Sequence, residues 1–241
     1  MKIKDATPFI MLIITVAALS QAQTLEEVLS KMYKAQGSIE KMKEHTTIKW
    51  SSIINVQGKE ATQYKYLKRP HFLRVESQVE GKTSIQAYDG KIAWQINPFK
   101  EIDKPQVMNE WETRQFALSA DIDGALYNYK EKEITVELMG RDDVDGTEVF
   151  KLKVTYKGLD VLYIYLDCET YLPIKSSYTF TQGDKKIVND NYYFDYKPVD
   201  SVFFANRIQV KVNNVLVFQV LHEKIEVNVP MDDSLFTMPS N

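Results

Sequence analysis

The sequence comprises 241 residues, of which 44% are hydrophobic, and its formal net charge is −3 at pH 7. This length fits one large β domain as well as two small ones, and the acidic balance argues against nucleic acid and against strong attraction to anionic membranes. Cys168 is the only cysteine, which excludes an internal disulfide, so the fold has to be held by its core alone.

The N-terminal segment has the order of a secretory signal peptide. Lysines near the start precede the apolar run 8–19, and small residues then occupy the positions that a signal peptidase reads. The run is shorter than the about 20 residues of a transmembrane helix; a buried N-terminal helix is the alternative. We predict that residues 1–22 are a signal peptide, cleaved after Ala22 or Gln23. No cysteine follows the run to carry a lipid, so we expect a soluble, unanchored mature protein.

An amphipathic helix is predicted next. Thr24 at the N-cap and Glu27 three residues later form a capping box, and the apolar residues that follow share one helical face up to Gly37, a favourable C-cap. After this helix the apolar residues alternate with polar ones between Ile48 and Ile96, with glycine-containing turns between the alternating segments. This pattern predicts an antiparallel meander and not β-α-β units.

Residues 107–130 interrupt the meander. The stretch contains no proline and one glycine, and apolar residues recur at helical spacing both before and after Asp123-Gly124. We predict two short helices here, with Asp121 and Asp123 as caps at their junction.

Strands are predicted to resume at Ile134 and to continue to Val229, and the C-terminal tail is expected to pack Leu235 and Phe236 onto the body. Antiparallel sheets bury one face and leave the other in water. A strongly curved sheet with helices across its open side would bury both the first helix and the insert. We therefore predict a mainly β fold, one domain over residues 23–241: an open half-barrel of antiparallel strands covered by a few short α-helices, with an apolar cavity between.

No catalytic motif is recognisable in the chain. The histidines lack the spacing of metal ligands, and His222 on the apolar side of a strand is interpreted as structural. The aspartates of residues 140–146 lack the spacing and the distal glutamate of an EF-hand, so a turn between two strands is expected. Cys168, at a strand-to-turn boundary with no histidine nearby in the sequence, is interpreted as a half-exposed thiol. We expect no cofactor and no metal.

A set of short motifs in residues 64–99 points to a known family. K-R-P at 68–70 ends one predicted strand, D-G-K at 89–91 forms a turn, and Trp94 and then N-P-F at 97–99 follow. In order and approximate spacing these motifs resemble LolA, the periplasmic carrier of outer-membrane lipoproteins. The C-terminal half departs from the better-known members and is similar to a broad group of exported LolA-like proteins known only as lipoprotein-sorting. The resemblance therefore implies the fold but does not identify the exact client that the protein carries.

The resemblance implies an open β half-barrel whose helical lid encloses the lipid chains of a client. In that family the arginine of K-R-P is held inside by hydrogen bonds to the lid backbone and keeps the lid shut until cargo arrives; Arg69 is the matching residue. Its guanidinium offers five donors in a rigid fork, and Pro70 restricts Arg69 to the β region. An exposed arginine at a hairpin corner is the alternative interpretation.

We accordingly expect a carrier in the periplasm of a Gram-negative bacterium, a monomer and not an enzyme. It would bind the acyl chains of lipoproteins, or another lipid, and deliver them toward the outer membrane. The resemblance implies an inner-membrane lipoprotein-releasing ABC transporter and an outer-membrane acceptor as partners. The residues that we interpret as candidate cavity or lid lining, with core packing as the alternative, are Trp50, Trp94, Phe99, Trp111, Phe116 and Leu118.

Two other functions stay open at this point. A non-enzymatic envelope sensor or adaptor with a LolA-like domain would bind lipid or a protein partner, although such relatives usually carry a second domain, for which we see no sequence here. A hydrolase of envelope material would have to use Asp143 or Cys168, and the sequence offers neither of them a recognisable base.

Overall fold

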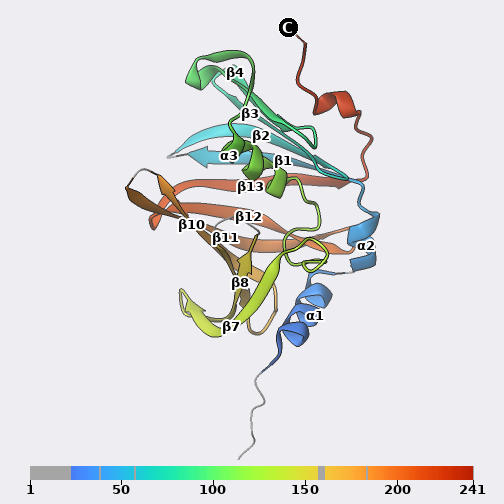
Figure 1. Cartoon of the computed structure of the whole chain (residues 1–241), viewed down its shortest axis with the longest axis vertical. Helices are drawn as coiled ribbons and strands as arrows, with labels where there is room; N and C mark the ends of the chain where they lie inside the picture. Colours follow the sequence, from blue (N-terminus) through green and yellow to red (C-terminus); the bar gives the residue numbers. More distant parts are fainter. Residues whose placement is uncertain (1–22, 38, 57, 157–160, 183, 241) are drawn as a thin grey trace, which may run out of the picture.

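The computed structural model describes residues 23–37, 39–56, 58–156, 161–182 and 184–240. The predicted signal peptide, residues 1–22, lies outside the described residues. The chain forms one thirteen-stranded antiparallel sheet with short helices (Figure 1). The strands are β1 (Thr47–Val56), β2 (Lys59–Lys68), β3 (Phe72–Val79), β4 (Lys82–Tyr88), β5 (Ala93–Asn97), β6 (Ile102–Val107), β7 (Thr135–Val144), β8 (Thr147–Thr155), β9 (Val161–Asp167), β10 (Pro173–Gln182), β11 (Lys185–Val199), β12 (Val202–Val212) and β13 (Val215–Val227).

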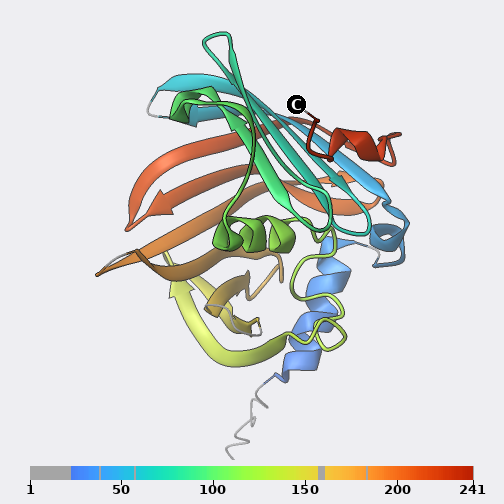
Figure 2. The same ribbon diagram turned by 45° about the horizontal axis from the view of Figure 1, so that its top comes forward.

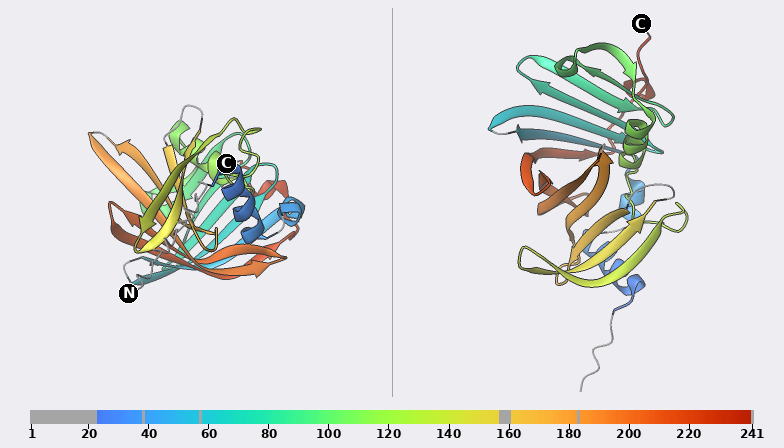
Figure 3. Two further views of the ribbon diagram at one scale, coloured as in Figure 1. Left: turned by 90° about the horizontal axis from the view of Figure 1, so that it is seen from below. Right: turned by 60° about the vertical axis from the view of Figure 1, so that its left-hand side comes forward.

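The helices are α1 (Leu25–Gln36), α2 (Ile39–Glu44) and α3 (Glu110–Ser119), together with the 3-10 turns η1 (Pro98–Lys100) and η2 (Asp233–Leu235). Figures 2 and 3 show a strongly curved sheet with the helices lying along its open side. The predicted fold class, a curved antiparallel sheet covered by a few short helices, is confirmed.

The strand order is β6-β5-β4-β3-β2-β1-β13-β12-β11-β10-β9-β8-β7. The chain meanders outward from β1 to the edge strand β6, crosses to the opposite edge strand β7, and meanders back until β13 pairs with β1. Among the described residues β6 and β7 do not pair with each other, so the sheet stays open. The crossing connection, residues 108–134, is the predicted insert.

Helix α1 begins at the predicted capping box. The Thr24 side chain accepts a hydrogen bond from the Glu27 backbone at 3.2 Å, and the Glu27 carboxylate accepts one from the Thr24 backbone at 2.8 Å. Its buried residues Val28, Leu29 and Met32 pack against the β7–β9 half of the sheet. Helix α1 therefore covers one half of the concave face.

Helix α3 covers the other half of the sheet. Asn109 caps it, with Glu112 completing a second capping box. Phe116 and Ala117 pack against a core that includes Leu73 of β3 and Ala93 of β5. The two halves of the sheet thus have separate cores, each closed by its own helix.

The second helix predicted in the insert does not form, so that prediction is wrong. After α3 the chain makes a series of turns as far as β7. Gly124, Asn128 and Glu133 have positive φ angles of 69°, 50° and 56°, which a right-handed helix does not accommodate. Asp121 and Asp123 therefore cap no helix there; the Asp121 carboxylate accepts from the Asp123 backbone N–H at 3.1 Å, as in an Asx turn.

The C-terminal tail packs onto the body, as predicted, and the structure places it on the outer face of the sheet. Phe236 is fully buried, and its ring lies 5.3 Å from that of Phe72. The backbone carbonyl of Phe236 accepts a hydrogen bond from the Trp94 indole at 2.8 Å, and that of Leu235 accepts one from Arg74.

Within the described part of the chain, no helix is both long and apolar enough to span a lipid bilayer.

Gly37 joins the helical layer to the sheet. It ends α1 with φ of 109° and forms an isolated bridge to Val202 of β12. A Cβ atom at this position would lie 2.1 Å from the backbone oxygen of Ser201. We predict that Gly37→Ala lowers the free energy of unfolding by more than about 3 kcal/mol, measured by denaturant titration, because strain and a backbone clash add.

Gly81→Ala is the matched control. Gly81 also has a positive φ, of 77°, but nothing lies within 4 Å of a Cβ there, so only the conformational strain of about 1–2 kcal/mol is expected. Equal losses in the two variants would contradict the importance of the close approach between α1 and β12.

Candidate functional site

A cavity of about 680 Å³ lies between the concave face of the sheet and the segments that cross it. Its size is within the about 300–1,000 Å³ of small-molecule sites. Helices α1 and α2 and the crossover residues 118–127 line one side, and inward-facing residues of β1, β2 and β9–β13 line the other. Apolar residues that line it include Met32, Met42, Ile48, Leu67, Ile122, Leu126, Ile164, Phe204, Ile208, Val210, Phe218 and Val220.

Two of the residues predicted to line a cavity, Trp50 and Leu118, line this one. Trp50 lies on the inner face of β1 with its ring edge-on to Phe204 at 6.3 Å. Leu118 lies in the last turn of α3. Phe116 is near them but packs into the core between α3 and the β1–β5 half of the sheet.

Trp94, Phe99 and Trp111 lie elsewhere. Trp94 is fully buried on the outer face of β5 beneath the C-terminal tail, because strand alternation places Ala93 inward. Phe99 in η1 is 50% exposed, and Trp111 in the first turn of α3 is 49% exposed with its ring 5.9 Å from that of Phe180. These residues do not touch the cavity.

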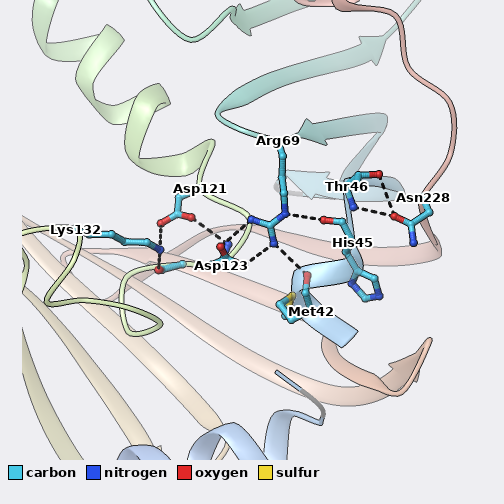
Figure 4. A network of polar contacts seen from close by, with 9 residues as sticks. Met42, His45, Thr46, Arg69, Asp121, Asp123, Lys132 and Asn228 are labelled. Carbon is cyan, nitrogen blue, oxygen red and sulfur yellow. Dashed lines mark hydrogen bonds and ion pairs between the residues drawn. The ribbon is translucent and has the colours of Figure 1, made fainter. Parts of the chain in front are cut away.

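Arg69 lies at the β2–β3 corner and joins two separate segments at the rim of the cavity (Figure 4). Its guanidinium donates to the backbone carbonyls of Met42 at 3.1 Å and His45 at 2.9 Å, at the C-terminus of α2. It also makes a bidentate ion pair with the Asp123 carboxylate, with N–O distances of 2.6 and 2.8 Å. The side chain therefore points inward and connects β2 and α2 to the crossover.

The electrostatics favour this arrangement. Burial acts to raise the pKa of Asp123, but the hydrogen bonds and the charge of Arg69 outweigh it and hold that pKa below its ordinary value. The pKa of Arg69 is raised, chiefly by its hydrogen bonds to Asp123. Next to this pair, Asp121 pairs with Lys132 at 2.6 Å, and Lys132 also donates to the Gly124 carbonyl. The turn of the crossover is thus cross-linked on both sides of Asp123.

The sequence does not identify Asp123 as a part of this site, because its position predicts a helix cap. The carbonyls of α2 were missed because the helix itself was not predicted. Lys65, which also lines the cavity, was not singled out either. Strand alternation puts Lys65 on the same face as Leu67, but Tyr64 and Tyr66 make the opposite face look apolar, so no local signal marks Lys65 as inward.

The other candidates for chemistry take structural places. Asp143 caps the β7–β8 turn by accepting from the Gly146 backbone, as expected. Burial raises the pKa of the Cys168 thiol, which disfavours the thiolate that a nucleophile needs. The His222 Nδ1 lies 2.8 Å from the Ser52 hydroxyl, and the residue also lines the cavity. Within the described residues no cluster of three or more potential metal ligands occurs.

The sequence matches no protein-family model and no curated protein. Among solved structures, the chain is similar to a LolA superfamily protein from Nitrosomonas europaea, with a TM-score of 0.59 at 11% identity over 90% of this chain and 98% of that one. The chain has a LolA-like fold.

Two further structures with the LolA-like arrangement support this result. A domain from Vibrio parahaemolyticus described as an outer membrane lipoprotein-sorting protein gives a TM-score of 0.55 at 12% identity, covering 86% of this chain and 94% of that one. A DUF1329 family protein from Desulfovibrio piger gives 0.57 at 13% identity, covering 88% and 96%. The likeness spans nearly the whole of each of these structures.

We predict that Arg69 and Asp123 are energetically coupled. Arg69→Met leaves a largely buried carboxylate and two helix-end carbonyls without their partner, and should cost about 2 kcal/mol or more in unfolding free energy. In the double variant with Asp123→Leu the loss should be smaller than the sum of the single losses by about 1–2 kcal/mol. Urea titrations of the four proteins give this coupling energy.

The more exposed pair Arg207–Asp195 provides the matched control cycle. Its coupling energy should stay below about 1 kcal/mol, as for surface ion pairs in general. A coupling energy at Arg69–Asp123 no larger than that of the control pair would mean that this ion pair does not stabilise the contact between β2, α2 and the crossover.

The pH dependence follows from the lowered pKa of Asp123. A depressed carboxyl pKa contributes stability that is present above the unfolded value of about 3.9 and is lost as the pH falls through the folded value. The stability difference between the protein and Asp123→Asn should therefore be constant from about pH 5 to pH 8 and shrink below about pH 4. Thermal unfolding across this range tests it; a difference that already fades at neutral pH would argue against the ion pair.

Proposed function

We propose that the protein is a non-enzymatic carrier, exported to the periplasm of a Gram-negative bacterium, that binds acyl chains of lipoproteins or another lipid and delivers them toward the outer membrane. The observation that carries the proposal is the largely apolar cavity of about 680 Å³ beneath a crossover that Arg69 ties to the sheet. By resemblance, an inner-membrane ABC transporter would supply the cargo and an outer-membrane acceptor would take it.

The energetics of an acyl chain fit this cavity. Each methylene group transferred from water to an apolar environment gains about 0.8 kcal/mol. Phe218, Val220 and Ile208 provide such an environment in one apolar cluster of the lining, and Ile48 and Leu67 provide it in another. Binding then requires no catalysis, and release has to come from a change in the cavity or from a partner.

Arg69 is suited to control that change. Moving the crossover away from α2 means breaking the Asp123 ion pair, while the bonds from Arg69 to the α2 carbonyls can stay in place. We propose that this contact is the latch of a lid formed by residues 118–134. The lipoprotein-sorting description of the similar Vibrio domain supports a cargo of this kind.

We predict that the protein purified without detergent carries acyl lipid, detectable by mass spectrometry of an organic extract. Ile208→Trp, which adds bulk on the cavity side of β12, should reduce the bound lipid severalfold because the added ring occupies the space of the chain. Leu221→Trp on β13 is the matched control, since Leu221 is 46% exposed on the other face and should leave the lipid content unchanged.

Absence of lipid from the native protein, together with failure of a fluorescent fatty-acid probe to bind, would contradict the carrier proposal. Equal lipid loss in both tryptophan variants would mean that the lipid lies outside the cavity. Near-ultraviolet circular dichroism of each variant checks that the fold is retained.

A further inference from the structure

Lys65 points into the cavity from the middle of β2. Strand alternation turns Gln63, Lys65 and Leu67 to the inner face, and all three line the cavity. Lys65 pairs across the strands with Trp50, and its ammonium lies 5.3 Å from the centre of that ring. Among the residues that the structure describes, no carboxylate forms an ion pair with Lys65 and no hydrogen bond reaches it.

The other charged groups around the cavity do not neutralise Lys65. The carboxylates that line it, Asp121 and Asp123, are engaged by Lys132 and Arg69. His222 lies close by on the same face; burial, together with the charge of Lys65, lowers its pKa to about 4. The imidazole is therefore neutral at physiological pH, and the described charged groups around the cavity provide no counter-charge for a Lys65 ammonium.

An ammonium group in this place is unfavourable for the empty protein. Burial lowers the pKa of Lys65, and a lysine that is shielded from bulk water is normally paired. A methionine or leucine would fill the same position without this cost. Since the ammonium lies on the cavity lining against the Trp50 ring and pairs with no anion of the described residues, its counter-charge is best supplied by the ligand.

We infer that Lys65 binds the anionic headgroup of a lipid whose hydrocarbon chain occupies the apolar cavity, a carboxylate or a phosphate monoester. The inference rests on the proposed carrier function and narrows its cargo. Apolar clusters lie on both sides of Lys65 along the strands, one with Ile48 and Leu67 and one with Ile54 and Val220, so a chain attached to the headgroup has an apolar path. A fully esterified, neutral lipid would leave the ammonium without a counter-charge.

The test compares ligands that share one sixteen-carbon chain. Palmitate, hexadecyl phosphate and the neutral hexadecanol compete with the neutral dye Nile red for the protein at neutral pH. We expect the anionic ligands to bind at least about tenfold more tightly than hexadecanol, as a charge-assisted hydrogen bond provides. Comparing palmitate with hexadecyl phosphate tells which headgroup fits better.

Lys65→Met should abolish this preference and leave hexadecanol binding within about twofold, while Lys65→Arg should keep the preference because the charge remains. Lys49→Met is the matched control: Lys49 lies on the outer face of the neighbouring strand, also over aromatic rings, and its loss should change nothing. Thermal unfolding of the ligand-free variants checks the fold, and Lys65→Met should be at least as stable as the parent.

The outcomes separate the two proposals. Equal affinity of the parent protein for palmitate and hexadecanol, or a preference that survives Lys65→Met, would overturn the role of Lys65 and leave the carrier function standing. Failure of all three ligands to displace the dye would overturn both.

Discussion

The connection between the two edge strands is the constraint on which the rest of the molecule depends. The chain leaves the sheet at β6 and re-enters it at β7, the opposite edge, so residues 108–134 have to cross the open side. Because the sheet curves, the crossing segment lies above the concave face and not on it. Helix α3 packs against the core at one end of this segment, and the turns around Leu126 join the α1 core at the other end. The middle of the segment therefore covers the cavity.

A segment made of turns carries polar groups that need hydrogen-bond or ion-pair partners, and this need explains the charged pairs in its middle. Asp121 and Asp123 bring two carboxylates to the rim, and each receives a cation from a different part of the chain, Lys132 and Arg69. The Arg69 guanidinium has further N–H donors, which donate hydrogen bonds to backbone carbonyls at the C-terminus of α2. One side chain therefore ties together three segments that are far apart in the sequence. The same contact lies at the rim of the cavity, because its partner Asp123 is one of the lining residues.

The sequence predicts the fold well because its signals are local. Alternation, turn residues and the capping box at Thr24 each need only a few neighbouring residues to be read. The prediction of a second helix in the insert is wrong because it also rests on a local signal. The apolar spacing after Gly124 resembles that of a helix, but positive φ angles at Asn128 and Glu133 prevent one from forming. Arg69 could be named from its motif, but its partner Asp123 is 54 residues away and nothing in the spacing connects them.

Which face of a strand turns inward was harder to predict. In β2 the tyrosines Tyr64 and Tyr66 look like the apolar face, yet they lie outside under Lys49, and the face with Gln63 and Lys65 is the inner one. Trp94 shows the same difficulty: it is buried by packing, the alternative to cavity lining, because the tail that covers it on the outer face comes from the far end of the chain. Alternation gives two faces, and only long-range packing decides which of them is the core.

The central claim is that the space between the sheet and the crossover holds an acyl chain. A crystal structure of the protein with palmitate carrying a bromine at its chain terminus tests it directly, because anomalous scattering locates the bromine without reference to the protein density. We predict a bromine peak inside the cavity, among the inward side chains of β12 and β13 such as Ile208 and Phe218. A bromine bound only on the outer face, or at the exposed apolar residues Phe99 and Trp111, would contradict the account.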